Sequence, residues 1–174
     1  MNLDEAVHTV TDRVTGPRPV VLIDGRSGSG KSTLAAAVAA ALDADLVRLD
    51  DLYPGWDGLE AGSRAVWEDL LPHGRWRPWD WHAARHMPER RIDPARPLVV
   101  EGCGALSRSA RSLATLGVWI ELDAAERHRR AIARDGESYE REWDRWAAQE
   151  DAFYARERSD LLADVVVDGR DLPV

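Results

Sequence analysis

The chain has 174 residues, of which 44% are hydrophobic, and a formal net charge of -8 at pH 7. This acidic balance argues against a nucleic-acid partner, because phosphate backbones are held by an excess of Lys and Arg. Its single cysteine, Cys103, excludes an intramolecular disulfide, and no apolar stretch approaches the roughly 18 residues that a membrane helix needs. We therefore expect a cytoplasmic domain spanning 1–174, as a monomer or homodimer, that binds a small molecule and no membrane.

The first predicted elements are a helix over 3–14 and a short β-branched strand over 19–23. A glycine-rich turn follows the strand, and the alanine-rich residues 32–42 predict a second helix. Strand, glycine turn and helix in this order place anions at a helix N-terminus, where free N–H groups and the helix dipole both favour negative charge.

The glycine turn contains the most specific motif of the chain, Gly-x-x-x-x-Gly-Lys-Ser, and we call this segment the phosphate loop. Lys31 of the motif is the only lysine among 23 basic residues, which implies a need for a compact ammonium group that a guanidinium cannot replace. In such loops the backbone N–H groups bind α- and β-phosphates, the lysine reaches the β- and γ-phosphates, and a hydroxyl ligates Mg²⁺. The candidate nucleotide-binding residues are Gly25, Ser27, Gly28, Ser29, Gly30, Lys31, Ser32 and Thr33.

The second predicted strand, 46–49, ends in Asp50-Asp51 and is followed by a long insertion over 52–96 that is rich in Trp, Pro and Arg. We expect the insertion to shape the substrate region and to contain one helix, over 62–71. The third strand, 97–101, ends in Glu101.

The last predicted elements are a strand over 118–123, a lid with a long following helix over 127–158, and a fifth strand over 164–168. Alternating strands and helices predict a parallel five-stranded sheet with helices on both faces. Within the long helix, residues at helical spacing predict a buried stripe. They are Tyr139, Trp143, Trp146, Glu150 and Phe153.

Three acidic sites follow strands of the predicted sheet, and ligands of such sheets bind beyond the carboxyl ends of the strands. Asp123, with Glu126 three residues on, fits the N-cap of a helix. Asp50 and Glu101 lie on the strands expected beside the phosphate loop, where carboxylates can orient an attacking hydroxyl or hold Mg²⁺. The alternative for both is capping of a turn.

These residues carry a resemblance to a family. Asp50-Asp51-Leu52-Tyr53 is similar to the Asp-x-Phe-Tyr or Asp-Asp-Phe-Phe segment of the uridine kinase and nicotinamide riboside kinase group of P-loop small-molecule kinases. Leu98-Val99-Val100-Glu101-Gly102 resembles the group's strand ending in Glu-Gly, and Arg127, Arg130 and Arg134 resemble its arginine-bearing lid. The resemblance implies the three-layer α/β/α fold of P-loop NTPases, with a five-stranded parallel sheet and a helical lid.

The resemblance also implies an activity, the transfer of the γ-phosphoryl group of ATP, with Mg²⁺, to a hydroxyl of a nucleoside-like or other small molecule. Asp50 would be the base for the hydroxyl, Ser32 and Glu101 would bind the metal, and Arg130 and Arg134 would contact phosphates together with Lys31. Such roles agree with phosphoryl transfer, in which positioning and electrostatic stabilisation dominate. A solvated helix face is the alternative for the two arginines.

The insertion supplies the remaining candidates. Trp79-Asp80-Trp81 keeps the aromatic-Asp-aromatic core of the Tyr-Asp-Phe segment of uridine kinases, whereas the following His82 and Arg85 are out of step with it. The tryptophans could stack on a substrate or only pack, and the aspartates could bind sugar hydroxyls or only cap turns. The candidate substrate-binding residues are Asp50, Tyr53, Trp56, Asp57, Trp79, Asp80 and Trp81. The rival function is a P-loop ATPase or nucleotide-dependent switch without an acceptor.

Overall fold

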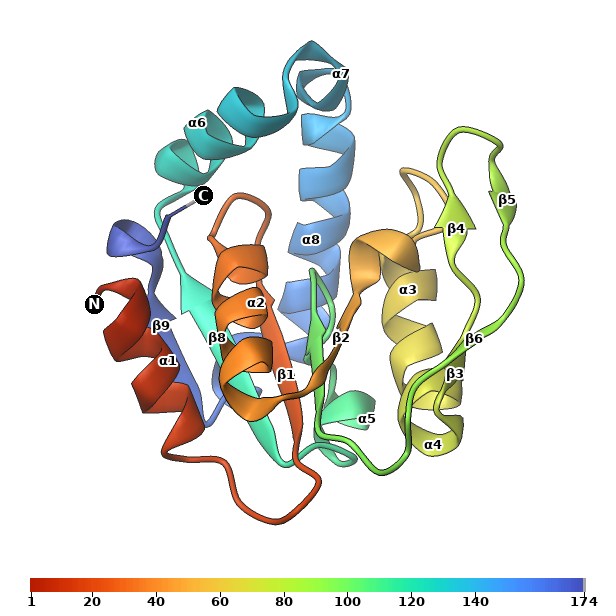
Figure 1. Cartoon of the computed structure of the whole chain (residues 1–174). Coiled ribbons are helices and arrows are strands. Elements are labelled where there is room, and N and C mark those ends of the chain that lie inside the picture. Colours follow the sequence, from red (N-terminus) through yellow and green to blue (C-terminus); the bar gives the residue numbers. More distant parts are fainter. Residues whose placement is uncertain (174) are drawn as a thin grey trace.

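The computed structural model describes residues 1–173 and places five parallel strands in one sheet (Figure 1). In spatial order the strands are β2 (Asp45–Arg48), β7 (Leu98–Glu101), β1 (Val20–Gly25), β8 (Leu116–Glu121) and β9 (Val165–Asp168). The register pairs Ile23 with Glu101 on one side and with Val118 on the other. The predicted α/β fold with a five-stranded parallel sheet is therefore confirmed.

One face of the sheet is covered by two helices, α1 (Leu3–Thr11) and α2 (Lys31–Leu42) (Figure 1). Fully buried side chains of both helices pack on alternate residues of the strands, as the period of two in a strand requires. This core includes Ala6, Val10, Leu34, Val38, Val21, Ile23, Val118 and Val167. The helix α1 begins with a capping box between Asn2 and Glu5. It ends at Thr11 and is therefore shorter than predicted.

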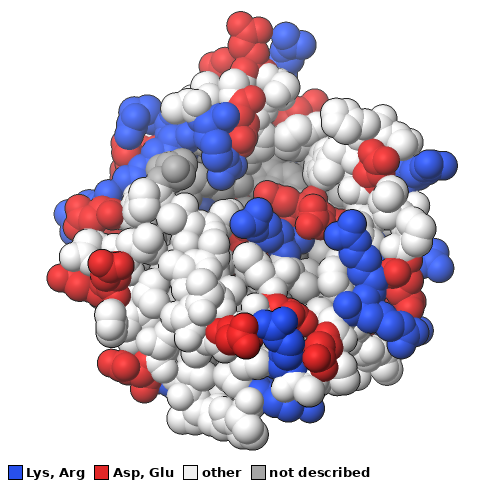
Figure 2. Space-filling model, in the orientation of Figure 1, with Lys and Arg blue, Asp and Glu red and all other residues white. Residues whose placement is uncertain are grey.

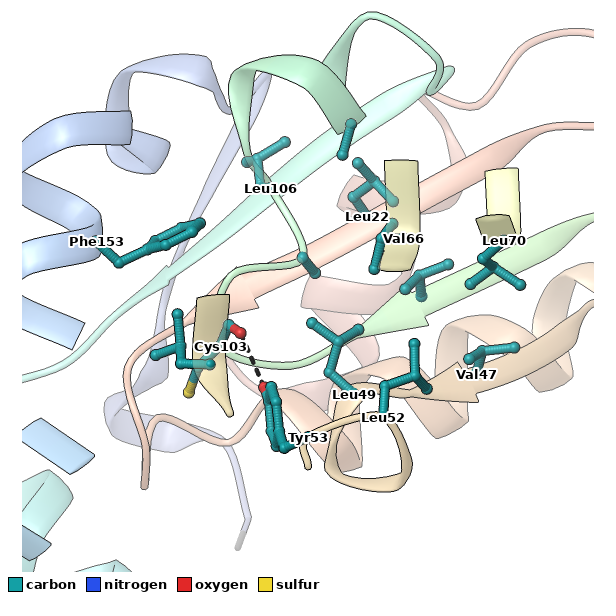
Figure 3. Close-up of a cluster of buried hydrophobic side chains, with 14 of the residues drawn as sticks. Leu22, Val47, Leu49, Leu52, Tyr53, Val66, Leu70, Cys103, Leu106 and Phe153 are labelled. Carbon is teal, nitrogen blue, oxygen red and sulfur yellow. Dashed lines mark hydrogen bonds between the residues drawn. The ribbon is translucent and has the colours of Figure 1, made fainter. Parts of the chain in front are cut away.

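The opposite face packs against a second layer of helices, which makes the fold three-layered. These are α3 (Leu59–Ala65), a π-helical turn over Val66–Leu70, α4 (Leu71–His73), α5 (Arg108–Arg111), α8 (Trp143–Glu157) and α9 (Ser159–Leu162). Figure 3 shows part of the core between them, in which Leu22 of β1 lies near Val66 and Leu106. Of the predicted stripe, Trp146, Glu150 and Phe153 of α8 are buried as expected, whereas Trp143 is half-buried and Tyr139 is buried on a separate short helix that precedes α8.

The insertion over 52–96 is helical for longer than predicted, from Leu59 to His73 without a break, and then forms two small antiparallel ribbons. In one ribbon β3 (Arg75–Trp76) pairs with β6 (Arg90–Arg91), and in the other β4 (Trp79–Asp80) pairs with β5 (Arg85–His86). In Figure 1 the ribbons lie beyond α3, at the edge of the molecule.

Two strand ends set the positions of the acidic residues. β2 ends at Arg48, one residue earlier than predicted, so Asp50 lies on a 3-10 turn over Leu49–Asp51. β8 is shifted toward the N-terminus relative to the prediction, because Asp123 caps the following helix and accepts hydrogen bonds from the N–H groups of Ala125 and Glu126. The prediction that Asp123 is an N-cap is thus confirmed.

The helix that Asp123 caps, α6 (Ala124–Asp135), and the short α7 (Glu137–Glu140) rise above the phosphate loop, and we call them the lid (Figure 1). After β9 a 3-10 turn over Gly169–Asp171 brings the chain back to α6, where Arg130 donates to the carbonyl oxygen of Gly169. Within residues 1–173, every helix is too short or too polar to cross a membrane.

Candidate functional site

The phosphate loop connects β1 to α2, and its glycines have the backbone conformation that such a turn requires. Gly28 and Gly30 have positive φ angles of 80° and 98°, and α2 begins directly at Lys31. A Cβ atom on Gly28 would lie 2.1 Å from the carbonyl oxygen of Arg127, so only glycine allows the loop to pack against the lid helix. The first amides of α2 point out of the helix end, which is the arrangement that binds anions.

The Lys31 side chain is buried, and its Nζ donates to the carbonyl oxygen of Arg26 over 3.2 Å. Burial by itself lowers the pKa of Lys31, but the acidic groups around it, among them Cys103, Glu101 and Glu150, outweigh burial and raise the pKa above its ordinary value. The ammonium therefore stays charged at neutral pH, as binding of phosphate requires.

A cavity of about 240 Å³ lies beside Lys31, under the lid. In the space-filling view a hollow opens below the top of the molecule, with basic and acidic side chains at its border (Figure 2). The structure brings many of the predicted residues together in the lining of this cavity. They are Ser27, Gly28, Lys31, Ser32, Asp50, Tyr53, Trp56, Trp81, Glu101 and Arg134.

Asp50 faces this cavity, and solvent still reaches its carboxylate. The pKa of Asp50 is raised because the surrounding protein removes part of its hydration, while Lys31 and Arg134 act in the opposite direction. A carboxylate with a raised pKa is more basic than usual, which suits it to accept a proton from a hydroxyl group.

Glu101 lies at the end of β7 and is only 2% exposed. Its Oε1 is 3.8 Å from Nε of Arg48 and has no hydrogen-bond partner among the described residues, 1–173. Burial raises the pKa of Glu101, and Lys31 opposes this shift. A buried carboxylate oxygen without a donor, beside Ser32 in the same cavity, fits a cation or its bound water.

The fit to Mg²⁺ is of a particular kind. Residues 1–173 contain no cluster of three or more His, Cys, Asp or Glu side chains that could hold a metal ion. Mg²⁺ in phosphoryl-transfer sites is bound by one or two protein oxygens and completed by phosphate oxygens and waters. Ser32 and Glu101 are the residues of the cavity lining that would supply such oxygens to a metal arriving with a nucleotide.

The wall opposite the phosphate loop is aromatic, with Tyr53 and Trp56 from the insertion and Tyr139 and Trp146 from the C-terminal helices. Trp56 packs against Tyr139 with ring centroids 5.5 Å apart, and Tyr53 packs against Trp146 at 4.8 Å. The Tyr53 hydroxyl donates to the carbonyl oxygen of Cys103 over 2.8 Å (Figure 3). The Tyr53 hydroxyl is thus hydrogen-bonded within the protein, so this ring offers mainly carbon surface to a ligand.

Three predicted substrate residues lie outside this cavity. The ring of Trp79 packs edge-on against His86 within the small hairpin. Asp80 accepts hydrogen bonds from the N–H groups of His82 and Ala83 and so caps the hairpin turn. Asp57 forms an ion pair with Arg145, and its side chain is 72% exposed. Packing, capping and a surface ion pair thus account for these residues.

The two lid arginines have different environments. Arg134 lines the cavity and forms an ion pair with Asp135. Arg130, one helical turn before Arg134, is buried against the C-terminal turn, where it donates to the carbonyl oxygens of Gly169, Arg170 and Leu172 and to Glu126. In this structure Arg130 is therefore occupied by the C-terminal turn rather than directed at the cavity.

The remaining predicted nucleotide-binding residues do not line the cavity: Gly25 ends β1, Ser29 and Gly30 lie in the loop, and Thr33 lies in the first turn of α2. Ser29 is fully buried, and its Oγ has no hydrogen-bond partner among the described residues.

Sequence reasoning missed several residues at the site. Asp24, one residue before the loop, is fully buried and accepts hydrogen bonds from the N–H groups of Gly104 and Leu106 and from the hydroxyl of Tyr154. Asp24 could have been found by the same feature that indicates Asp50, an acidic residue at the end of a strand. The predicted stripe on α8 indicated only burial, whereas Trp146 also lines the cavity.

Solved structures resemble this chain closely in fold although not in sequence. A possible uridine kinase from Bacillus stearothermophilus matches with a TM-score of 0.65 and 19% identity, over 95% of this chain and 97% of that chain. A gluconokinase from Sinorhizobium meliloti 1021 matches with a TM-score of 0.53 and 21% identity, over 88% and 83% of the two chains. No protein-family model matches the sequence, and no curated protein does.

The expected similarity to P-loop small-molecule kinases is thus confirmed at the level of structure. At this identity the similarity establishes the fold and leaves the activity to be argued from the site itself.

Proposed function

We propose that this protein is a kinase that transfers the γ-phosphoryl group of ATP, in the presence of Mg²⁺, to a hydroxyl group of a nucleoside-like or other small molecule. The observation that carries the proposal is that residues of the phosphate loop, among them Lys31, line the same cavity as Asp50 and Glu101. An anion-binding loop with a basic carboxylate beside it supports transfer to an alcohol, since a phosphate acceptor would need no base.

In the proposed reaction Asp50 accepts the proton of the acceptor hydroxyl while its oxygen forms a bond to the γ-phosphorus. The bond between the γ-phosphorus and the β–γ bridging oxygen breaks, and ADP leaves with that electron pair. Charge spread over the γ-oxygens is stabilised by Lys31 and by Arg134 of the lid. Bound Mg²⁺, held through Ser32 and Glu101, would neutralise further phosphate charge.

The acceptor would occupy the part of the cavity between Asp50 and the aromatic wall. Ring surfaces such as those of Trp56 and Trp81 bind planar groups or the apolar faces of sugars, so they support an acceptor with a ring. Neither Asp57 nor Asp80 contributes in this arrangement, since each is held by other partners.

The test is acceptor-dependent release of ADP, measured with MgATP and a panel of nucleosides, sugars and hydroxylated antibiotics. An acceptor that is phosphorylated and accelerates ADP release supports the kinase, whereas turnover that no acceptor changes supports the rival ATPase or switch. Lys31→Ala should abolish transfer, and Asp50→Asn should reduce it by roughly 100-fold or more while nucleotide binding persists. Asp57→Asn, a matched loss of an exposed carboxylate from the insertion, should leave transfer unchanged.

A further inference from the structure

Glu150 of α8 is a carboxylate buried directly beside the phosphate loop. Its side chain is only 1% exposed. Its Oε1 accepts a hydrogen bond from the backbone N–H of Ser27, the third residue of the loop, over 2.8 Å. The same oxygen lies 3.2 Å from Nε1 of Trp146 and 3.2 Å from Sγ of Cys103, both of which line the cavity.

Two arginines, one from the loop and one from the lid helix, lie near the other carboxylate oxygen of Glu150. Oε2 of Glu150 is 3.6 Å from Arg26 and 4.0 Å from Arg127. Arg127 in turn donates to the carbonyl oxygen of Ser27 over 3.3 Å. The backbone of Ser27 is thus held at its N–H by α8 and at its C=O by the lid helix, which fixes the loop between two elements distant in sequence.

This arrangement is unusual in its charge. A loop that binds phosphates is expected to be surrounded by donors and cations, yet a buried carboxylate lies against it and draws Arg26 and Arg127 toward itself. In the protein interior, where screening is weak, such a charge opposes a bound polyanion over several ångströms.

We propose that Glu150 is a positioning residue with two effects: its hydrogen bond fixes the Ser27 segment of the loop, and its negative charge limits how tightly the loop holds a nucleotide. The charge would thereby favour departure of ADP after transfer. The inference rests on the proposed function, because it takes the loop to be a nucleotide site.

The decisive variant is Glu150→Gln, which keeps an oxygen acceptor for the Ser27 N–H and removes the charge. Titration calorimetry with ADP should show binding roughly five- to tenfold tighter than in the wild type. In steady-state assays the inhibition constant for product ADP should fall by the same factor. A merely structural role predicts weaker binding instead, since any loosening of the loop can only impair it.

Asp151→Asn is the matched control. Asp151 adjoins Glu150 in sequence and pairs with the same Arg26 over 2.6 Å, but its side chain is 71% exposed. Solvent screens its charge, so ADP affinity should stay within about twofold of the wild type. A second variant, Glu150→Asp, retains the charge on a shorter stem that no longer reaches the loop equally well, and it should bind ADP no more tightly than the wild type.

The outcomes separate this inference from the proposed function. Wild-type protein that fails to bind ADP would overturn the proposed function itself. Wild-type binding together with unchanged or weaker binding by Glu150→Gln overturns the inference alone. Tighter binding by Glu150→Asp overturns it as well, and this arm remains informative should the Gln variant not fold.

Discussion

The indole Nε1 of Trp81 donates a hydrogen bond to the backbone carbonyl oxygen of Asp50 over 2.9 Å. Trp81 lies in the turn of the small hairpin of the insertion, and its ring also packs edge-on against Trp56 with centroids 5.2 Å apart. The insertion therefore contributes to the site in two ways, as a wall of the cavity and as a brace for the 3-10 turn that carries the proposed base.

Replacement of Trp81 by Phe tests this brace, because the variant keeps an aromatic ring but loses the indole N–H together with part of the ring surface. The loss of the hydrogen bond to the Asp50 carbonyl should lower kcat by roughly 3- to 10-fold. The KM for ATP should stay unchanged, because this hydrogen bond joins two segments outside the phosphate loop. The control is Trp79→Phe, two residues earlier in the hairpin and packed on His86, which should retain wild-type kcat. Equal rates for both variants would argue against a brace.

The pH dependence of transfer should report the carboxylate of Asp50. The base must be deprotonated, so kcat/KM should fall as the pH decreases. Because the surrounding protein removes part of the hydration of Asp50 and raises its pKa, the acid limb should lie above the ordinary carboxyl value of 3.8. Arg134 lowers this pKa, so Arg134→Ala should shift the acid limb to higher pH. A pH–rate profile of Asp57→Asn serves as the reference and should overlay the wild type.

A packing prediction concerns Gly62 of α3, which is buried against Tyr53 of the cavity wall. A Cβ atom at this position would meet Cδ1 of Tyr53 at 2.5 Å. Alanine is the better helix former by about 1 kcal/mol, but overpacking of a tight core costs about 1–3 kcal/mol. Gly62→Ala should therefore give no increase in melting temperature and should reduce acceptor binding, because Tyr53 must move. Thermal unfolding by circular dichroism and the acceptor KM are the measurements, and a raised melting temperature with an unchanged acceptor KM would contradict the prediction.

The parts of the site that could be predicted from the sequence are those in which local order determines geometry. A strand, a glycine turn and a helix in direct succession can hardly place Lys31 and Ser32 elsewhere than at a helix N-terminus. Parallel strands likewise bring their carboxyl ends to one edge, so Asp50 and Glu101 could be expected to meet.

The rest depends on contacts between segments distant in sequence. Arg130 and Arg134 are one helical turn apart on the same face of the lid helix, and only the folded C-terminal turn, which binds Arg130, shows that Arg134 alone lines the cavity. Glu150 belongs to a helical stripe whose period indicates burial, but periodicity says nothing of the partner, here the N–H of Ser27. The strands β4 and β5 have only two residues each, so their sequence specifies the hairpin register weakly. The sequence therefore could not tell that Trp81, and not Trp79, lines the cavity.

The separation of the two lid arginines gives a last prediction, in which stability and activity should respond to different substitutions. Arg130 is buried and donates to three carbonyl oxygens of the C-terminal turn, so Arg130→Ala leaves those acceptors without donors and should lower the free energy of unfolding by about 3 kcal/mol. The Arg134 side chain is 45% exposed, and within residues 1–173 it pairs with its neighbour Asp135 alone, so Arg134→Ala should cost little stability. Its loss should instead reduce transfer, because Arg134 lines the cavity near Asp50. Chemical denaturation and kcat, measured on both variants below the melting temperature of the weaker one, separate the two effects, and a variant pair with the opposite pattern would place Arg130 at the phosphates.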